Sequence, residues 1–446
     1  MAARPRRVSV LPLLLLQAFL PFSSWAQQPP VASAPSLQLT LKQAADLALK
    51  QNPQRIIARL LVSESDRNSQ IARSALLPQL GVAASGSLNQ YNVQSIERSE
   101  MRAPAGPFQY VEAGPTFSQT ILDLPLIRGY QIGREGTREA RADERTTRET
   151  VVDAVVDQYL VILRAMALRD AAQARVALAQ RLYDQASQLQ KTGVGLNIDA
   201  VRANVELQNE KQNLIDAETE TRTSAYALAE LLDLPRDQEV EATDQLGFFE
   251  LPAFDKESLL DQAMASRPEV ASLNSQSRIA QLSVDSAREE RLPRLDFSGF
   301  WFYQGEHFDS GLPTYSYQVS MMFPLFTSGQ IHAEVEKAKL EEQRIDENRR
   351  EVEARIVDQV KTALDQLNAA RNAVDVANLG YQLAQDEVAQ AQRRFQAGVT
   401  TNIEVITAQD ELARASDNRI DALYRFNISR ADLARATGTV EAMYAK

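Results

Sequence analysis

The chain of 446 residues has no cysteine, and its only histidines are His307 and His332. Without cysteine it can form no disulfide and can carry no lipid on an N-terminal cysteine, so we do not expect a lipoprotein. The two histidines belong to no histidine-carboxylate cluster with metal-ligand spacing. We therefore expect no metal, no cofactor and no enzymatic activity.

Basic residues are also scarce relative to acids. The chain holds 48 Lys and Arg against 59 Asp and Glu, a formal net charge of −11. A nucleic-acid partner requires a basic face, so no such partner is expected.

Long apolar runs are missing except at the N-terminus. Residues 1–7 contain three arginines, an apolar run extends from Val8 to Phe22, and Ser24-Trp25-Ala26 follows. This order predicts a signal peptide over residues 1–26, because a membrane anchor would need a longer run without prolines. No later stretch is apolar for the 18 or so residues of a transmembrane helix. An exported chain of this kind can still cross a membrane as a closed β-barrel.

The chain contains an internal duplication. A pattern that includes Gly193-Val194, Asn197-Ile198 and Glu206-Leu207 returns 205 positions later as Gly398-Val399, Asn402-Ile403 and Glu411-Leu412. Upstream, Asn52-Pro53 matches Arg267-Pro268, and Leu77-Pro78 matches Leu292-Pro293, both at an offset of 215. A long-period repeat of this kind fixes the architecture before any site is considered.

Each copy changes from helical to strand-like periodicity. We expect a helix over Leu41–Gln51 capped by Thr40, and a second helix from Pro53 to about Leu77. Residues 79–91 alternate like a strand, and residues 108–124 predict a second strand that Gly114-Pro115 interrupts.

The second copy predicts a clearer strand pair. One face would hold Leu295, Phe297, Gly299, Trp301 and Tyr303, and then Tyr315, Tyr317, Val319, Met321 and Phe323. Ser316, Gln318 and Ser320 lie opposite. An aromatic face backed by small polar residues is typical of a barrel with lipid outside and water inside, although soluble sheets alternate too.

Very long helices follow each strand pair. Residues from about 130 to 191 and from about 331 to 396 contain no proline. At ~1.5 Å per residue, each helix would reach roughly 100 Å. A narrow apolar seam of coiled-coil type is formed by Ile345, Val352, Ile356, Val360, Ala363 and Leu367. Gly193 and Gly398 should end these helices, and Asn197 and Asn402 should cap the returning ones.

The strand count demands several copies of the chain. Two hairpins supply four strands, whereas small membrane barrels need at least eight, and an open edge is not tolerated in lipid. A cyclic trimer would give twelve strands with quasi-sixfold symmetry.

The order of these motifs resembles the TolC-like outer-membrane efflux protein family. The segment LTLKQAADLALKQNPQ, its echo SLLDQAMASRPEV and the paired turns GVGLNID and GVTTNIE support the resemblance, which covers nearly all of the chain after Leu37. It implies a homotrimer in the outer membrane of a Gram-negative-type cell, with a long periplasmic extension. Such a trimer works with a periplasmic adaptor and an inner-membrane pump in efflux or type I secretion.

The expected fold is mainly α with a small membrane β part. A duplicated helix-strand-strand-long helix hairpin would form, in the trimer, a twelve-stranded outer-membrane β-barrel continued by a periplasmic α-helical barrel. The predicted divisions are a signal peptide (1–26), a first repeat (27–235), an inter-repeat linker (236–256), a second repeat (257–440) and a tail (441–446). Within the repeats, strands are expected at about 79–124 and 294–324, and helical hairpins at about 128–232 and 329–437.

The turns at the helix tips are the first candidate site. The resemblance implies that the adaptor docks there, on Gly193, Val194, Gly195 and Leu196 and on Gly398, Val399, Thr400 and Thr401. A glycine turn exposes backbone and a small apolar knob to another helical hairpin. Some relatives have an arginine just after the second glycine, where this chain has Val399 and Thr400. A plain glycine helix cap is the simpler interpretation of both turns.

Carboxylates beside the turns are the second candidate site. Asp199 and Glu404 begin the returning helices, and Glu206 and Glu411 lie seven residues further along. A trimer would gather them into rings at the periplasmic aperture, where they would attract cations and raise one another's pKa. Compensation of the helix dipole by first-turn acids is the alternative.

A periplasmic coiled-coil adaptor that bridges the membranes is the main alternative function. It would share the export signal and a helical hairpin. It should not contain two amphipathic strand pairs or the full duplication.

Overall fold

The computed structural model describes residues 36–91, 105–193, 196–252 and 254–445. The predicted signal peptide, residues 1–26, lies outside these described residues. Among the helices that are described, none is both long enough and apolar enough to cross a membrane.

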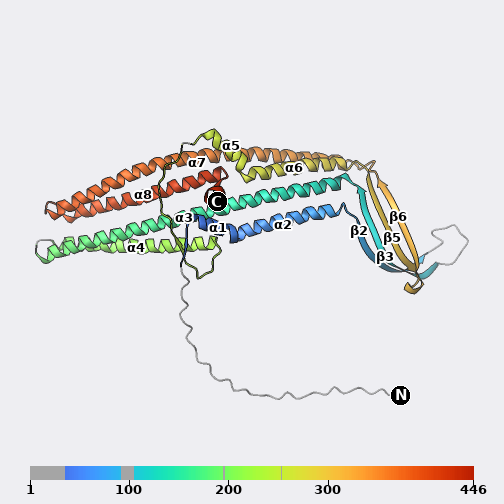
Figure 1. Ribbon diagram of the computed structural model, residues 1–446, viewed down its shortest axis with the longest axis horizontal. Helices are drawn as coiled ribbons and strands as arrows, with labels where there is room; N and C mark the ends of the chain where they lie inside the picture. Colours follow the sequence, from blue (N-terminus) through green and yellow to red (C-terminus); the bar gives the residue numbers. More distant parts are fainter. Residues whose placement is uncertain (1–35, 92–104, 194–195, 253, 446) are drawn as a thin grey trace, which may run out of the picture.

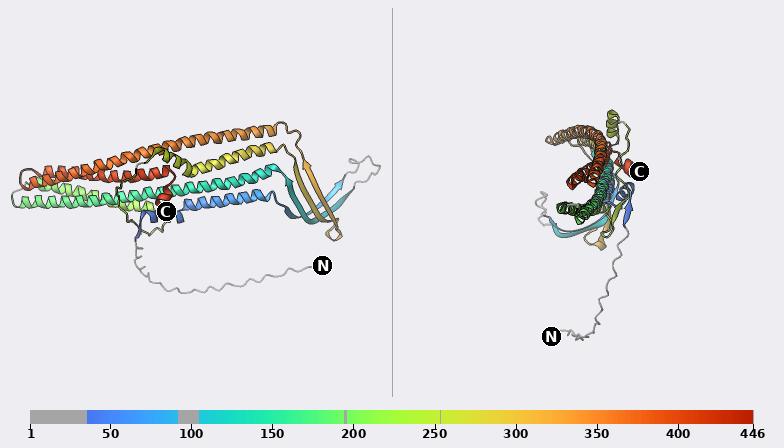
Figure 2. Two further views of the ribbon diagram at one scale, coloured as in Figure 1. Left: turned by 45° about the horizontal axis from the view of Figure 1, so that its top comes forward. Right: turned by 90° about the vertical axis from the view of Figure 1, so that its left-hand side faces the viewer.

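The molecule is a long helical body with a four-stranded sheet at one end and two helical tips at the other (Figure 1). The longest helices are α3, Leu124–Lys191, with 68 residues, and α7, Gln330–Gln396, with 67. They return as α4, Asn197–Leu231, and α8, Asn402–Ala436, each of 35 residues. Viewed along its length, the helical body is a curved layer rather than a closed bundle (Figure 2).

The duplication is visible in matched element lengths. Helices α1, Leu41–Gln51, and α5, Lys256–Ser266, each have 11 residues. Helices α2, Pro53–Ser74, and α6, Pro268–Glu289, each have 22 and begin with proline, which a first helical turn tolerates. The predicted Thr40 cap is confirmed, since its side chain accepts a hydrogen bond from the Gln43 backbone N–H in a capping box.

The sheet has the strand order β2-β3-β5-β6. Its strands are β2, Gln79–Tyr91; β3, Ala105–Leu122; β5, Arg294–Gly305; and β6, Leu312–Met322, and neighbours are antiparallel. The expected interruption at Gly114-Pro115 affects one side of the strand only. Strand β3 continues through both residues and pairs there with β2, but neither residue has a partner in the register with β5. A Cβ at Gly114 would lie 2.9 Å from the Phe302 ring and 2.1 Å from the Trp301 carbonyl oxygen, so only glycine permits this approach of β5.

The two faces of the second strand pair are as predicted within the strands. Phe297 pairs with Val319 and Trp301 with Tyr315 on the aromatic face, whereas Ser298 pairs with Gln318 on the other. Phe323 lies beyond the end of β6. The polar face also contains Phe300 and Phe302, whose ring centroids are 4.7 Å apart.

The inter-repeat linker and the C-terminal tail contain structure that the sequence did not predict. Strand β4, Val240–Ala242, lies in the predicted linker and pairs in parallel with β1, Leu37–Leu39. Beyond residue 439, the chain forms the short helix α9, Val440–Tyr444, with both end residues buried. The Tyr159 hydroxyl of α3 lies 2.8 Å from the Leu39 carbonyl oxygen and 2.9 Å from an Asp244 carboxylate oxygen. These contacts fasten the linker and the N-terminal strand to the middle of the helical body.

Apolar seams hold each hairpin together. The α7 residues Ile356, Val360, Ala363 and Leu367 are buried in one cluster with Ala422 and Phe426 of α8, which confirms the predicted seam there. Nearer the tips, both hairpins share a cluster that is rich in alanine: Leu182, Ala186, Ala200, Ala203, Val388, Ala391, Val405 and Ala408. Alanine side chains let the helices approach closely near the tips.

Candidate functional site at the helix tips and the seam between the repeats

Both long helices end at a glycine in the left-handed region. Gly193 has a φ of +78° and Gly398 a φ of +70°, as predicted for residues that follow a helix. The Val399 N–H donates to the Arg394 carbonyl oxygen at 3.0 Å and closes the second turn. Leu196 is 66% exposed and Val399 68%, so each tip presents an apolar side chain to solvent. Val194 and Gly195, the remaining predicted members of the first turn, lie outside the described residues.

The predicted asparagine caps are wrong by one position. Leu196 and Thr401 occupy the cap positions, and neither makes a side-chain cap hydrogen bond. Asn197 instead accepts a hydrogen bond at 2.8 Å from the Gln190 side chain across its own turn. Asn402 is fully buried, and its Nδ2 donates to the Asp199 carbonyl oxygen at 2.9 Å. Because Asp199 belongs to the first repeat, Asn402 joins the two tips to one another.

The two first-turn carboxylates differ in their partners. Glu404 lies 2.8 Å from the Arg394 guanidinium and accepts a hydrogen bond from the Thr400 hydroxyl. The hydrogen bond from Thr400 lowers the pKa of Glu404 most, and the contact with Arg394 lowers it further. Asp199, its equivalent in the first repeat, has no ion pair within the described part of the chain. A residue that the sequence analysis missed, Arg394, therefore distinguishes the second tip.

The second pair of acids also occupies unlike environments. Glu206 is partly buried and faces the second repeat, and its pKa is raised by burial and then by the charges of Asp410 and Glu210. Glu411 is exposed and forms an ion pair with Arg414 at 3.2 Å. The structure does not bring Glu206 and Glu411 together within one chain.

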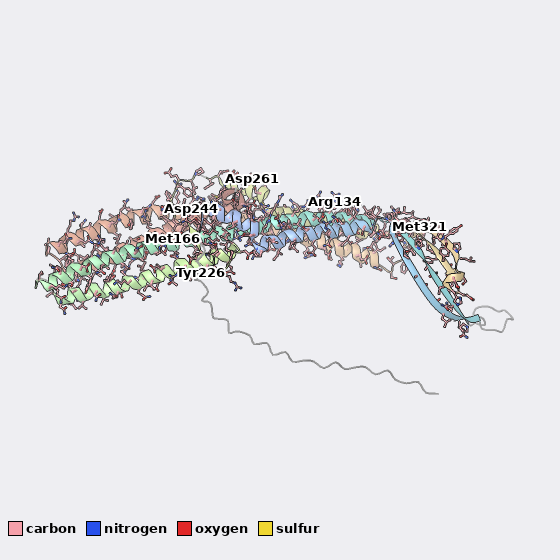
Figure 3. All side chains as sticks on the ribbon, turned by 60° about the horizontal axis from the view of Figure 1, so that its bottom comes forward. Arg134, Met166, Tyr226, Asp244, Asp261 and Met321 are labelled. Atoms are coloured by element: carbon pink, nitrogen blue, oxygen red, sulfur yellow. The ribbon has the colours of Figure 1, made fainter. Side chains whose placement is uncertain are left out.

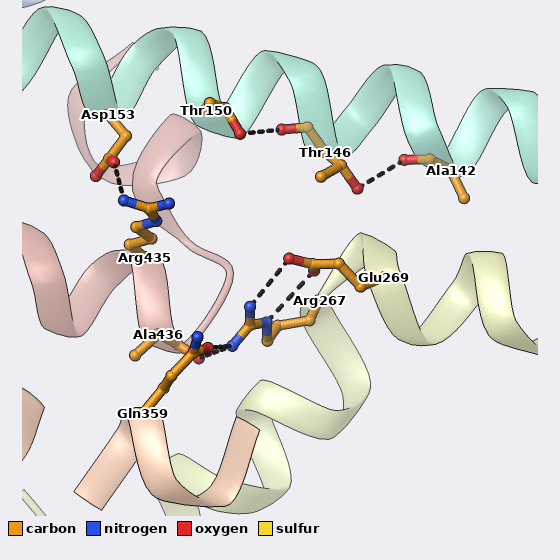
Figure 4. A network of polar contacts seen from close by, with 9 residues as sticks. All are labelled: Ala142, Thr146, Thr150, Asp153, Arg267, Glu269, Gln359, Arg435 and Ala436. Carbon is orange, nitrogen blue, oxygen red and sulfur yellow. Dashed lines mark hydrogen bonds and ion pairs between the residues drawn. The ribbon is translucent and has the colours of Figure 1, made fainter. Parts of the chain in front are cut away.

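Ion pairs cross the seam between α3 of the first repeat and α8 of the second. Arg164 contacts Asp421 at 2.7 Å, and Arg175 contacts Asp417 at 2.8 Å. A third pair joins Asp153 and Arg435 at 2.8 Å near the middle of the molecule (Figure 4). Three ion pairs therefore join the two repeats along this seam.

A group of buried and half-buried carboxylates lies beside the third ion pair. Asp153 is only 4% exposed. Burial raises the pKa of Asp157, one helical turn away, to about 6, and the charges of Asp153 and Asp432 add to the shift. Nothing in the local sequence marks this group, because it depends on which faces of α3 and α8 meet.

A family model matches most of the chain. The family model described as "Outer membrane efflux protein" matches residues 44–233 and 259–439. This match covers both repeats and does not favour the adaptor alternative.

Individual relatives have low sequence identity to this chain but align with most of its length. The chain is 23% identical over 403 residues to the pyoverdine export outer membrane protein OpmQ of Pseudomonas putida, covering 85% of this chain and 81% of that protein. It is 21% identical over 386 residues to the outer membrane protein TolC of Vibrio cholerae, covering 83% and 84%.

Solved structures share the fold. A membrane protein from Pseudomonas aeruginosa superposes with a TM-score of 0.79 at 16% identity, covering 93% of this chain and 99% of that one. The CmeC outer membrane channel of Campylobacter jejuni superposes with a TM-score of 0.77 at 19% identity, covering 90% and 85%. On the family match, with the duplicated fold in agreement, the chain belongs to the outer membrane efflux protein family and is an outer-membrane efflux channel.

Proposed function

We propose that the protein is the passive exit duct of a tripartite efflux or type I secretion system. Three copies would close one barrel and one tunnel, and would work with a periplasmic adaptor and an inner-membrane pump. The observation that carries the proposal is the four-stranded sheet with two open edges at the end of helices roughly 100 Å long.

Trimeric assembly follows from the strand edges. Among the described strands, β2 and β6 each pair with one neighbour only, so each leaves a row of backbone groups unpaired. Lipid cannot satisfy these groups, whereas pairing β6 of one copy with β2 of the next does so. Three chains of four strands then form a closed ring of twelve.

The tips are the proposed adaptor-docking surface. Leu196 and Val399 are exposed at the end furthest from the sheet, where a periplasmic partner would reach them first (Figure 1). Because both are apolar and sit beside glycine turns, they suit packing against another helical hairpin.

The proposed aperture has carboxylates at its mouth. Asp199 would supply the free negative charge, while the charge of Glu404 is compensated by Arg394. Glu206 and Glu411 lie seven residues further from the tips and would form the next level of the tunnel.

Assembly and docking can be tested together. The mature protein in mild detergent should have the mass of three chains, measured by light scattering with detergent correction. A monodisperse monomer would contradict the proposal that the protein is an exit duct. Leu196→Cys and Val399→Cys should then crosslink to the adaptor through a short thiol-reactive linker. Cysteine at Tyr226, exposed on α4 and distant from the tips, should not.

A further inference from the structure

A cavity of about 600 Å³ lies between the first-repeat hairpin and the second-repeat helix α8. Residues 242–246 of the linker form one of its edges. Met166 of α3 and Asp244 of the linker, both in its lining, are labelled in Figure 3 between the tips and the middle of the molecule. Its volume suits a small organic molecule rather than a polypeptide segment.

Part of the cavity wall is apolar, and charged and polar side chains form the rest. Leu163, Met166 and Leu178 come from α3, and Leu412 and Leu423 come from α8. A bound ligand would therefore contact both repeats through apolar side chains.

Most charged groups of the lining already have partners. Asp244 accepts from the Leu41 N–H at 2.8 Å and contacts the Tyr159 hydroxyl. Glu210 contacts Arg175 at 3.3 Å. The Arg419 guanidinium donates to Asn378 at 2.8 Å and lies 5.0 Å from the centre of the Tyr381 ring. Asp170 pairs with Arg169 at 2.7 Å.

Two carboxylates of the lining, Glu206 and Asp410, have no ion pair among the described residues. Glu206 is partly buried and Asp410 is exposed. Desolvation raises the pKa of both, and the charge of Asp410 adds to the shift of Glu206. Arg414 acts against the shift of Asp410, but its ion pair is with Glu411. In addition, the Gln409 Nε2 is buried without an acceptor in the described structure. The cavity thus combines apolar wall segments with two carboxylates that form no ion pair among the described residues.

We propose that this cavity binds an amphipathic organic cation, whose charge lies between Glu206 and Asp410 and whose apolar body packs on α3. This goes beyond the proposed duct, because passage along a tunnel requires no site between the two repeats. A bound cation would relieve the repulsion between the two carboxylates. Since the walls come from both repeats, it would also hold the two hairpins together.

The test uses ethidium, a planar aromatic cation, and phenanthridine, its uncharged parent ring. Binding to the assembled protein in nanodiscs of zwitterionic lipid is measured by fluorescence, with empty nanodiscs subtracted. Ethidium should bind. The double substitution Glu206→Gln with Asp410→Asn should weaken ethidium binding about tenfold, which corresponds to ~1.4 kcal/mol. The matched pair Glu218→Gln with Asp386→Asn, exposed acids away from the cavity, should change neither probe. The affinity for phenanthridine should be the same in the original chain and in these variants.

A second variant locates the bound dye. Ala174→Phe places a large ring at an exposed position of the cavity lining, and Ala177→Phe places one at an exposed position outside it. Ala174→Phe should abolish ethidium binding while Ala177→Phe leaves it intact, with trimer migration on gels as the control for folding. Ethidium affinity unchanged by Ala174→Phe, or by the carboxylate pair, would place the dye elsewhere and overturn the proposal.

Discussion

The two tips of this chain share a backbone and differ in charge. Each long helix ends at a left-handed glycine, and each returning helix has 35 residues with an acid in its first turn. Glu404 nevertheless has Arg394 beside it, whereas the equivalent position in the first repeat is Leu189. The duplication has kept the geometry that closes the turn and has let the electrostatics diverge. A trimer would therefore have quasi-sixfold symmetry in its backbone and only threefold symmetry in its free charge.

The largest expected effect tests whether the two repeats are equivalent in the membrane. Val82 of the first repeat and Val319 of the second are both exposed on the aromatic face of the sheet. Arginine at either position, if near the midplane, should destabilise the barrel by ~2–4 kcal/mol and reduce the yield of heat-modifiable trimer. Gln318→Arg, on the opposite face, should assemble normally. The reverse pattern would show that the aromatic face is the one that lines the water-filled interior.

The next effect concerns the contact between the tips. Asn402→Ala removes the hydrogen bond from a buried side chain to the Asp199 carbonyl oxygen and should cost about 1–2 kcal/mol of local stability. Asn197→Ala, the exposed equivalent, should cost less than about 0.5 kcal/mol. Hydrogen exchange of the tip amides in the assembled protein measures both. Equal protection in the two variants would mean that the tips do not depend on this contact.

A smaller effect is a pH dependence of stability that comes from Asp157 of the first repeat. The pKa of Asp157 is about 6 in the folded protein, above its ordinary value of 3.8. Its stabilising contribution is therefore fully present below pH 3.8 and is lost as the pH rises through 6. From pH 5 to pH 7 this group should cost about 1 kcal/mol, a loss that Asp157→Asn should remove.

Thermal melts of the assembled protein at pH 5 and pH 7 would detect the change. Asp358→Asn, an exposed acid of the second repeat, is the control and should retain the pH dependence of the original chain. Identical pH dependence in the Asp157→Asn protein would refute the assignment.

The smallest effect is electrical and tests the charge difference directly. Asp199→Asn should lower cation preference in single-channel recordings more than Glu404→Gln does, because Glu404 is already paired. Arg394→Leu gives the second tip the residue of the first and should raise cation preference by freeing Glu404. If all three variants conduct alike in correctly assembled trimers, these acids serve only to compensate the helix dipole.

Local signals in the sequence were enough to predict most of the helical and strand elements. Proline at a first turn, glycine after a helix and a Thr40 capping box each act within a few residues, so their effects can be predicted without tertiary structure. Gly114 could not be interpreted in this way, because its role depends on Phe302, which is distant in sequence. Gly114-Pro115 interrupts the pairing with β5, as the sequence suggested, but the close contact of Gly114 with that strand could not be predicted.

The candidate site was predicted only in part. The positions of Asp199 and Glu404 follow from the repeat, yet the partners Arg394 and Asn402 depend on the rotation of each helix about its axis. The approach of Glu206 to Asp410 depends in addition on how one hairpin lies against the other. Such relations between helix faces are not determined by hydrophobic periodicity within one helix.

The Tyr159 contacts have a mechanical consequence. They fasten α3 near the middle of the molecule, and the helix extends from there to Lys191 without a further anchor to β1 or the linker residue Asp244. At ~1.5 Å per residue this arm is roughly 48 Å long, and the ion pairs of Arg164 and Arg175 join it to α8. Tilting the arm together with α8 by about 10° around Tyr159 would displace its tip by roughly 8 Å. A small rotation near the middle of the molecule would thereby become a larger displacement at the far end, shared by both repeats.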